Sequence, residues 1–274
     1  MPMIQRSFSF ALGILLAAAA CTVNPYKAAN RSYKQQAKAY ARVLRQAPLS
    51  AGTDSVPLPP YWVGTVNFNL RKPNFVIIHH TAQNSCPQTL ETFTVTRTQV
   101  SAHYVICRDG TIHHMLNDYL RAWQAGVSKW GNVTDINSIS IGIELDNNGF
   151  EPFPPAQINS LLRLLSTLKT TYHIPAANFI GHGDIAPTRK DDPSSYFPWK
   201  QLADGGFGLW YGDTTGVAVP FGFSSLTALR LIGYDVSDSS AAALAFKRHF
   251  ESDTTRSWGD QEEKVLYTLY RQYE

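Results

Sequence analysis

The fold is decided by residues 74–80, which read NFVIIHH. Four successive apolar residues are typical of a strand that is buried on both faces, and here two histidines close the run. A second strand is predicted at residues 138–145, SISIGIEL, because its apolar residues alternate with Ser140, Gly142 and Glu144. Ser140 and Gly142 are small, so we expect room for a ligand on the face that carries Glu144.

Further elements extend outward from these two strands. They are a helix through Leu90, Phe93 and Val100, strands at residues 103–108, 111–115 and 178–182, and a long amphipathic helix at residues 156–172. The dipeptide Asp109-Gly110 marks a hairpin turn between two of the strands. Strands that interleave with helices predict an α/β fold, with a mixed central sheet flanked by helices.

The chain is long enough for one medium domain and a smaller one. Its 274 residues, 44% of them hydrophobic, can bury a core, which excludes global disorder. We predict the main domain at residues 61–203, a glycine-rich linker at residues 204–223 and a small C-terminal three-helix module at residues 224–274. The net charge is only +3, and basic residues are not concentrated in one domain, so nucleic acid is not an expected partner.

The N-terminus has the layout of an export signal. An apolar run at residues 8–20 follows Arg6, is too short to span a membrane and ends in small residues, so residues 1–20 are predicted to be a signal peptide. Cys21 then resembles the acylated cysteine of a bacterial lipoprotein. The alternative is ordinary cleavage after Ala20. Thr22 stands where an inner-membrane retention aspartate would be, which favours the periplasmic face of the outer membrane.

Residues 21–60 are predicted to form a basic tether and a proline-rich linker. Six cations recur on one helical stripe, namely Lys27, Arg31, Lys34, Lys38, Arg42 and Arg45. Tyr33 and Tyr40 lie on the opposite face, so the helix either contacts an anionic membrane beside the lipid anchor or packs on the main domain. The remaining cysteines, Cys86 and Cys107, would persist as a disulfide in an oxidising compartment, but two free thiols are equally compatible with the sequence.

Three residues suit a metal site. His79, His182 and Asp192 offer two imidazoles and one carboxylate, a set that leaves the fourth position of a tetrahedral zinc open for chemistry. His182 stands between two glycines, which permit close approach of the backbone to a metal. Residues 181–193 are too polar to be expected in the core. The spacing alone does not exclude structural histidines.

Six motifs, taken in their order along the chain, indicate a family resemblance that the spacing of His79, His182 and Asp192 alone does not. They are VIIHHTA at residues 76–82, SAHYVI at 101–106, RDGT at 108–111, AWQAG at 122–126, SIGIE at 140–144 and GHGDIAPTRKDDP at 181–193. Together they resemble the type-2 zinc N-acetylmuramoyl-L-alanine amidases, which are related to peptidoglycan recognition proteins. The layout is similar to that of lipoprotein members of this family, and residues 224–274 look like their peptidoglycan-binding helical module.

The resemblance implies a role for each matching residue. His79, His182 and Asp192 would be the Zn²⁺ ligands, Glu144 the catalytic base and Lys190 the catalytic cation. Zinc makes water available as hydroxide at neutral pH, a carboxylate can shuttle its proton and a cation can stabilise the oxyanion. The bond cut would be the amide between N-acetylmuramic acid and L-alanine of the stem peptide, in cell-wall turnover or recycling.

The chain departs from the family at one motif and is ambiguous at two others. Gln124 stands where the family commonly has histidine in a Trp-His-Ala-Gly motif of the substrate groove, so Trp123 and Gln124 are expected to contact substrate. Two doublets, His79-His80 and Asp191-Asp192, leave each ligand ambiguous by one residue, and alignment favours the first histidine and the second aspartate. His113 and His114 are expected to be structural.

The sequence therefore predicts an exported, membrane-anchored zinc amidase that binds peptidoglycan or muropeptides. A peptidoglycan-binding module without hydrolysis is the alternative, which the intact ligand set disfavours. A secreted toxin or phage-type lysin with the same chemistry is a third hypothesis, against which Cys21 speaks. The sequence leaves open whether intact, soluble or 1,6-anhydro substrates are preferred.

Overall fold

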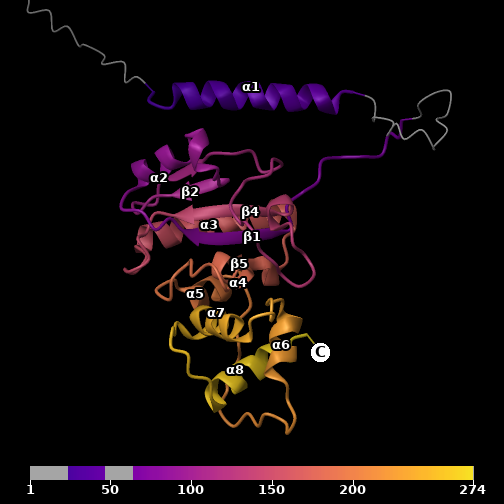
Figure 1. Ribbon diagram of the computed structural model, residues 1–274, viewed down its shortest axis with the longest axis vertical. Coiled ribbons are helices and arrows are strands. Elements are labelled where there is room, and N and C mark those ends of the chain that lie inside the picture. Colours follow the sequence, from indigo (N-terminus) through magenta and orange to yellow (C-terminus); the bar gives the residue numbers. More distant parts are fainter. Residues whose placement is uncertain (1–23, 47–63, 274) are drawn as a thin grey trace, which may run out of the picture. The chain divides into compact units, whose positions relative to one another are not determined.

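The computed structural model describes residues 24–46 and 64–273, which fall into two compact units, Met1–Trp62 and Val63–Glu274 (Figure 1). Each unit is described by itself. The predicted signal peptide, Cys21 and the proline-rich part of the tether lie outside the described residues.

The first unit contributes one helix, α1, over Lys27–Leu44. None of its residues is buried, and the side chain of Tyr40 is 54% exposed. The predicted basic stripe lies on this helix, apart from Arg45, which is its C-terminal cap. Among the described helices, none is long and apolar enough to cross a membrane.

The second unit is built on a five-stranded sheet with the order β3-β2-β4-β1-β5. Its strands are β1 Phe75–His80, β2 Tyr104–Ile106, β3 Ile112–His114, β4 Ser140–Leu145 and β5 Phe179–Gly181. All neighbours are parallel except the β2–β3 hairpin, which turns at the predicted Asp109-Gly110. The predicted α/β fold with a mixed sheet is confirmed.

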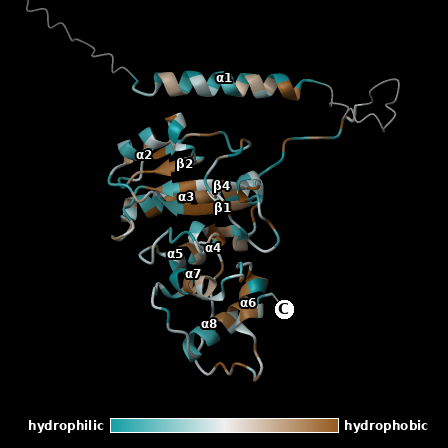
Figure 2. Ribbon diagram, in the orientation of Figure 1, coloured by the Kyte–Doolittle hydropathy of each residue, from teal (hydrophilic) through white to brown (hydrophobic). Residues whose placement is uncertain are grey.

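One face of the sheet is covered by α3, Pro155–Tyr172. Leu161, Leu165 and Leu168 of this helix pack on Val76 of β1 and Ile143 of β4, all of them buried. These strands are among the most hydrophobic ribbons of the molecule in Figure 2. Alternate residues of a strand point to opposite faces, so the odd-numbered residues of β1 lie on the other side of the sheet. That second face holds a smaller apolar cluster around Ile77 and Ile180 and bears the candidate site.

The helix predicted through Val100 is shorter than expected. It is α2, Cys86–Thr92, followed by a 3₁₀ turn η1, Thr96–Thr98. Residues 94–96 read Thr-Val-Thr, and β-branched side chains lose rotamer freedom in a helix, which favours its end here. Cys86 at the start of α2 forms a disulfide with Cys107 just after β2, which answers the question left open by the sequence.

The C-terminal residues form α6 Ser225–Ile232, α7 Ser239–Glu251 and α8 Asp260–Tyr270. Their apolar side chains make a separate cluster that includes Leu229, Phe246 and Leu266. Trp210, from the predicted glycine-rich linker, packs against both this cluster and the α3 core. Short elements complete the unit, namely η2 Ile136–Ser138, η3 Ala176–Asn178, α4 His182–Ile185 and α5 Trp199–Asp204.

Candidate metal centre

Three strand ends carry predicted site residues. His79 is the next-to-last residue of β1, Glu144 is the next-to-last residue of β4, and His182 directly follows β5 as the first residue of α4. Because β1 is parallel to both β4 and β5, these carboxyl ends meet at one edge of the sheet. The register pairs His79 with Glu144, so both side chains emerge on the face opposite α3.

The predicted metal ligands converge at this edge. Nδ1 of His79 lies 3.0 Å from Nδ1 of His182, and Oδ2 of Asp192 lies 3.0 Å and 3.1 Å from these two atoms. All three residues are buried. The structure thus brings together residues that are 103 and 113 positions apart from His79 in the chain.

The outer nitrogens of both histidines are already bonded. Nε2 of His79 lies 2.5 Å from Oε1 of Gln124, and Nε2 of His182 lies 3.1 Å from the carbonyl oxygen of Ala125. Carbonyl oxygens only accept hydrogen bonds, so each Nε2 must be the protonated nitrogen. In the neutral rings, both Nδ1 atoms therefore turn lone pairs toward the Asp192 carboxylate.

Three electron-pair donors that face one another across about 3 Å fit a cation. Zinc with ligand distances near 2.0–2.1 Å in a tetrahedron has ligand atoms about 3.3 Å apart, close to the separations found here. Burial lowers the pKa of His79, but the Glu144 and Asp192 carboxylates outweigh it, so this pKa is raised. The same negative surroundings favour a metal ion.

Within each doublet, His79-His80 and Asp191-Asp192, the two side chains lie in different surroundings. His80 follows His79 in β1 and points to the opposite face, where its Nδ1 accepts a hydrogen bond from the backbone of Ser194. Asp191 is exposed, whereas Asp192 is buried against the histidines. The geometry therefore selects the residues that the alignment favours.

Glu144 lies beside the candidate metal ligands, and one of its carboxylate oxygens has no hydrogen-bond partner in the described part of the chain. This oxygen, Oε2, is covered by protein. Burial raises the pKa of Glu144 to about 7, against the opposing charges of His79 and Lys190. A carboxyl group that is balanced between its two forms near neutral pH suits proton transfer.

Lys190 lies on the loop between His182 and Asp192. Its backbone nitrogen donates to the carbonyl oxygen of Ala186, which ends the turn after α4. Within residues 24–46 and 64–273, its ammonium group has no ion-pair partner, and the side chain is half-buried. Its charge opposes the rise in the pKa of Glu144, so it lies within electrostatic reach of that carboxyl.

The two residues expected in the substrate groove point in different directions. Trp123 is 53% exposed, and its backbone is held by Oγ of Ser101. Gln124 is 9% exposed and lies behind His79 instead. The room expected over Gly142 is filled by Gln124, because a Cβ on Gly142 would lie only 2.6 Å from its Cγ.

The C-terminal helices contact the loop that carries two of the ligands. The carboxylate of Asp184 accepts hydrogen bonds from His249 Nδ1 at 2.7 Å and from the Tyr234 hydroxyl at 2.9 Å. The ring of His249 stacks on Trp199 with centroids 3.9 Å apart. Gly183 leaves room for α7, since a Cβ there would lie 2.8 Å from Nη1 of Arg248.

Residues 181–186 are all buried, contrary to the expectation that this segment is too polar for the core. Its polar groups are buried because they are bonded, as Asp184 and His182 show. No local pattern in the sequence indicated Tyr234 or His249, which lie 50 and 65 residues from their partner Asp184.

His113 and His114 lie on β3, at the far edge of the sheet from β1. His114 stacks on Tyr104 and contacts Asp118. His113 lies near Cys86 and Cys107, but these cysteines are joined to each other and are not free ligands.

Comparisons with known proteins agree with this geometry. The model of the Amidase_2 family, described as N-acetylmuramoyl-L-alanine amidase, matches residues 69–195. The N-acetylmuramoyl-L-alanine amidase AmiD of Escherichia coli is 34% identical over 222 residues, covering 70% of this chain and 79% of that protein. The 1,6-anhydro-N-acetylmuramyl-L-alanine amidase AmpD of Haemophilus influenzae is 41% identical over 104 residues, 38% of this chain and 56% of that protein.

Solved structures extend the similarity through most of the molecule. E. coli AmiD in complex with anhydro-N-acetylmuramic acid-L-Ala-D-gamma-Glu-L-Lys has a TM-score of 0.66 and 30% identity, and the match covers 81% of this chain and 96% of that one. AmpDh3 of Pseudomonas aeruginosa has a TM-score of 0.68 and 28% identity, with 80% and 98% covered. Both matches are longer than the family model and so reach beyond residues 69–195.

Proposed function

The chain belongs to the N-acetylmuramoyl-L-alanine amidases of the Amidase_2 family, and from this premise we propose that it is a zinc enzyme whose ligands are His79, His182 and Asp192. It hydrolyses the amide bond between N-acetylmuramic acid and L-alanine of peptidoglycan stem peptides. It is thus an enzyme and not the non-hydrolytic recognition module that was the alternative. Released anhydromuropeptides are the proposed substrates, because AmiD and AmpDh3 were each solved with such a molecule.

One observation carries the proposal. Three buried ligand atoms face one another at 3.0–3.1 Å, directly beside a carboxylate oxygen that has no partner in the described residues. When bound, zinc supplies Lewis acidity, which makes water nucleophilic at neutral pH and polarises a carbonyl group. His79, His182 and Asp192 would hold the metal, and a set of three protein ligands would leave a position open for substrate or water.

Glu144 is the proposed general base and then the general acid. Its carboxylate takes one proton from the attacking water while the water oxygen bonds to the amide carbon. When the carbon–nitrogen bond breaks, Glu144 returns the proton to the nitrogen of L-alanine, so proton and electron pair balance. Its free, covered Oε2 and a pKa of about 7 support both halves of this cycle.

Lys190 is the proposed oxyanion partner. The carbonyl oxygen becomes negatively charged as water adds, and a fixed ammonium group lowers the energy of that state. The side chain of Lys190 suits this role because no carboxylate among the described residues already neutralises it. The exposed Trp123 is proposed to contact the sugar or peptide beside the site.

Mass spectrometry of anhydromuropeptides incubated with the protein tests this function. We expect free stem peptide and free anhydromuramic sugar, loss of both products with a chelator and recovery with zinc. Glu144→Gln should bind zinc as tightly as the parent and lose about 100- to 10,000-fold in turnover, since proton transfer contributes that much. Cleavage that survives chelation would exclude a metal enzyme, and full turnover by the variant would exclude Glu144 as the base.

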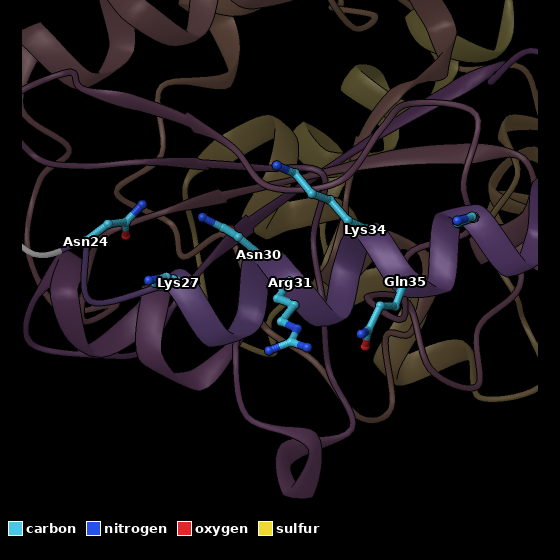
Figure 3. A pocket seen from close by; sticks show the side chains of 7 residues that line it. Asn24, Lys27, Asn30, Arg31, Lys34 and Gln35 are labelled. Atoms are coloured by element: carbon cyan, nitrogen blue, oxygen red, sulfur yellow. The ribbon is translucent and has the colours of Figure 1, made fainter.

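A membrane location is the second part of the proposal. Residues 1–20 would direct export, acylated Cys21 would insert in the outer membrane, and α1 would lie on its anionic surface. Four cations of α1 line one pocket together with three amides, and most of these side chains are labelled in Figure 3, namely Lys27, Arg31, Lys34 and Lys38 with Asn24, Asn30 and Gln35. A single acyl chain binds membranes only marginally, so a basic segment beside it strengthens the anchor. The Cys86–Cys107 disulfide suits the oxidising periplasm.

Vesicle binding separates the contribution of α1 from that of the lipid. Unacylated protein should bind phosphatidylglycerol vesicles and leave them as salt rises, because each cation contributes about 1 kcal/mol near an anionic surface. Replacing Arg31, Lys34 and Lys38 with Gln should weaken binding about fivefold per charge. Replacing the exposed Arg71, Lys72 and Arg97 with Gln removes the same charge elsewhere and should have little effect. Equal losses in the two triple variants would refute a role of α1.

Cell fractionation tests the lipid anchor itself. The full chain should be found in the outer membrane fraction and incorporate labelled fatty acid, and Cys21→Ala should do neither. Protein released into the medium would instead favour the secreted-lysin hypothesis.

A further inference from the structure

We infer that Gln124 is a positioning residue that fixes both the orientation and the tautomer of the metal ligand His79. The inference rests on the metal site proposed above. It replaces the expectation that Gln124 contacts substrate, because the side chain is buried and its amide oxygen lies 2.5 Å from Nε2 of His79.

The direction of each hydrogen bond follows from the backbone outward. The carbonyl oxygen of Ile136 can only accept, so the hydroxyl of Ser140 donates to it at 2.7 Å. That hydroxyl has one proton, and its oxygen must accept the 2.8 Å bond from the amide nitrogen of Gln124. The amide oxygen of Gln124 is thereby turned toward His79.

The consequence for His79 is a single tautomer. An amide oxygen cannot donate, so in the neutral ring Nε2 of His79 carries the proton and Nδ1 is left with a lone pair. Nδ1 is also the atom that faces His182 and Asp192. The outer partner of a metal-binding histidine commonly selects the ligating nitrogen in this way.

The backbone at Gln124 is also fixed by hydrogen bonds. Oδ1 of Asn137 accepts hydrogen bonds from the backbone nitrogens of Gln124 and Ala125, at 3.1 Å and 2.9 Å. The carbonyl of Ala125 in turn accepts from Nε2 of His182. Two successive residues thus hold the two histidine ligands, one through a side chain and the other through the backbone.

Two residues of β4 are explained by this arrangement. Ser140 anchors the amide, and Gly142 provides the space in which the side chain of Gln124 lies. Ser140, Gly142 and Glu144 alternate along one face of β4. The same strand therefore carries the two residues that position Gln124 behind His79 and the proposed base, Glu144.

Zinc affinity, measured by competition with a chromophoric chelator, tests the inference in the full chain. Gln124→Leu keeps the approximate volume but leaves Nε2–H of His79 without an acceptor, and affinity should fall about 10- to 100-fold. Gln124→His should restore much of it, because an imidazole can accept from His79 at one nitrogen and donate to Ser140 at the other. In ¹⁵N spectra, the slowly exchanging Nε2–H of His79 should become fast exchanging in the leucine variant only.

Gln157 offers a matched control for the loss of a buried amide. It is fully buried and donates to the carbonyl oxygens of Ile106 and Asp146, with no contact to a metal ligand. Gln157→Leu should lower stability and leave zinc affinity unchanged. Ser140→Ala provides a milder variant, and its zinc affinity should fall in the same direction but less.

The outcomes distinguish the inference from the function on which it rests. Asp192→Ala should lose zinc binding, and wild-type affinity in that variant would refute the metal site itself. If Asp192→Ala loses zinc while Gln124→Leu and Ser140→Ala both bind it with wild-type affinity, only the positioning role is overturned. Equal losses in the Gln124 and Gln157 variants would also overturn it, because the effect would then be general to buried amides.

Discussion

Helices α1 and α7 both carry several cations, yet they meet opposite surroundings. No residue of α1 is buried, and within the described residues of its own unit none of its side chains forms an ion pair. On α7, Lys247 is 1% exposed, and its ammonium group lies 2.8 Å from Asp253 and 3.1 Å from Glu262. The ammonium group also donates to the hydroxyl of Thr255 and to the carbonyl and hydroxyl oxygens of Ser257. The number of cations on a helix therefore says little about its role, which depends on the partners that other segments supply.

The largest expected effect is on the α7 side of this comparison. Lys247→Met leaves the half-buried carboxylates of Asp253 and Glu262 without their cation and the carbonyl oxygen of Ser257 without its donor. Losing a buried cation together with these partners should cost about 3 kcal/mol of unfolding free energy. Urea unfolding measures the loss. Lys38→Met on α1 is the matched change and should stay within about 0.5 kcal/mol of the parent. Similar losses in both variants would remove the distinction between the two helices.

A pair of tyrosines sharpens the comparison. Tyr234 is buried and its hydroxyl donates to Asp184, whereas Tyr40 on α1 is exposed. Tyr234→Phe should lower unfolding free energy by about 2 kcal/mol, because a hydrogen bond to a carboxylate is lost in the interior. Tyr40→Phe should be neutral. We also expect weaker zinc binding in Tyr234→Phe but not in Tyr40→Phe, since Asp184 lies on the segment between His182 and Asp192. Unchanged zinc affinity in Tyr234→Phe would mean that the C-terminal helices do not influence the metal site.

The pH dependence of stability gives a smaller effect, at the end of α7. Burial, with Glu262 next, raises the pKa of Glu251 from 4.5 to about 7, and its Oε1 has no partner in the described chain. The folded protein therefore holds this proton more tightly than the unfolded chain, and stability is lost as pH rises from about 4.5 to 7. Glu251→Gln should remove that loss and raise the unfolding free energy at pH 8 by about 1 kcal/mol. The gain is modest because the side chain is only half-buried and solvent screens its charge.

Unfolding at pH 5 and pH 8 measures this contribution. The exposed Glu91 on α2 provides the control, and Glu91→Gln should differ little from the parent at either pH. A Glu251→Gln variant with the same stability gain at both pH values would contradict the assignment.

The smallest effect is expected on the α1 side. Replacing Arg31, Lys34 and Lys38 together with Gln should change unfolding free energy by less than about 0.5 kcal/mol, because these side chains are exposed. The value of kcat/KM for a soluble anhydromuropeptide should also be unchanged. A clear loss of either would mean that α1 supports the amidase and does not serve only as a tether.

The sequence predicted the sheet well because its signals are local. Strict alternation identified the faces of β4, and the apolar run before His79 identified β1, each within two residues of the observed bounds. Residue type and motif order also singled out His79, His182 and Asp192 as one group, and the structure brings them together.

Features set by distant partners could not be predicted in this way. The inward turn of Gln124 depends on Asn137 and Ser140, and the burial of Asp184 depends on helices that follow much later in the chain. The pairing of Cys86 with Cys107 likewise requires the positions of α2 and β2 relative to each other. The family resemblance placed Gln124 in a substrate groove, and local polarity placed residues 181–193 outside the core, whereas tertiary hydrogen bonds permit the burial of Gln124 and Asp184.

The bond from His249 to Asp184 also bears on how this protein can be recombined with others. The C-terminal helices cannot be removed without consequence for this segment, because their removal would expose the carboxylate of Asp184, which lies between the proposed metal ligands His182 and Asp192. A chimaera that joins this catalytic domain to a foreign cell-wall-binding domain would therefore have to retain Tyr234 and His249. Conversely, a graft of the module onto another amidase would need an aspartate at the position of Asp184 to receive it.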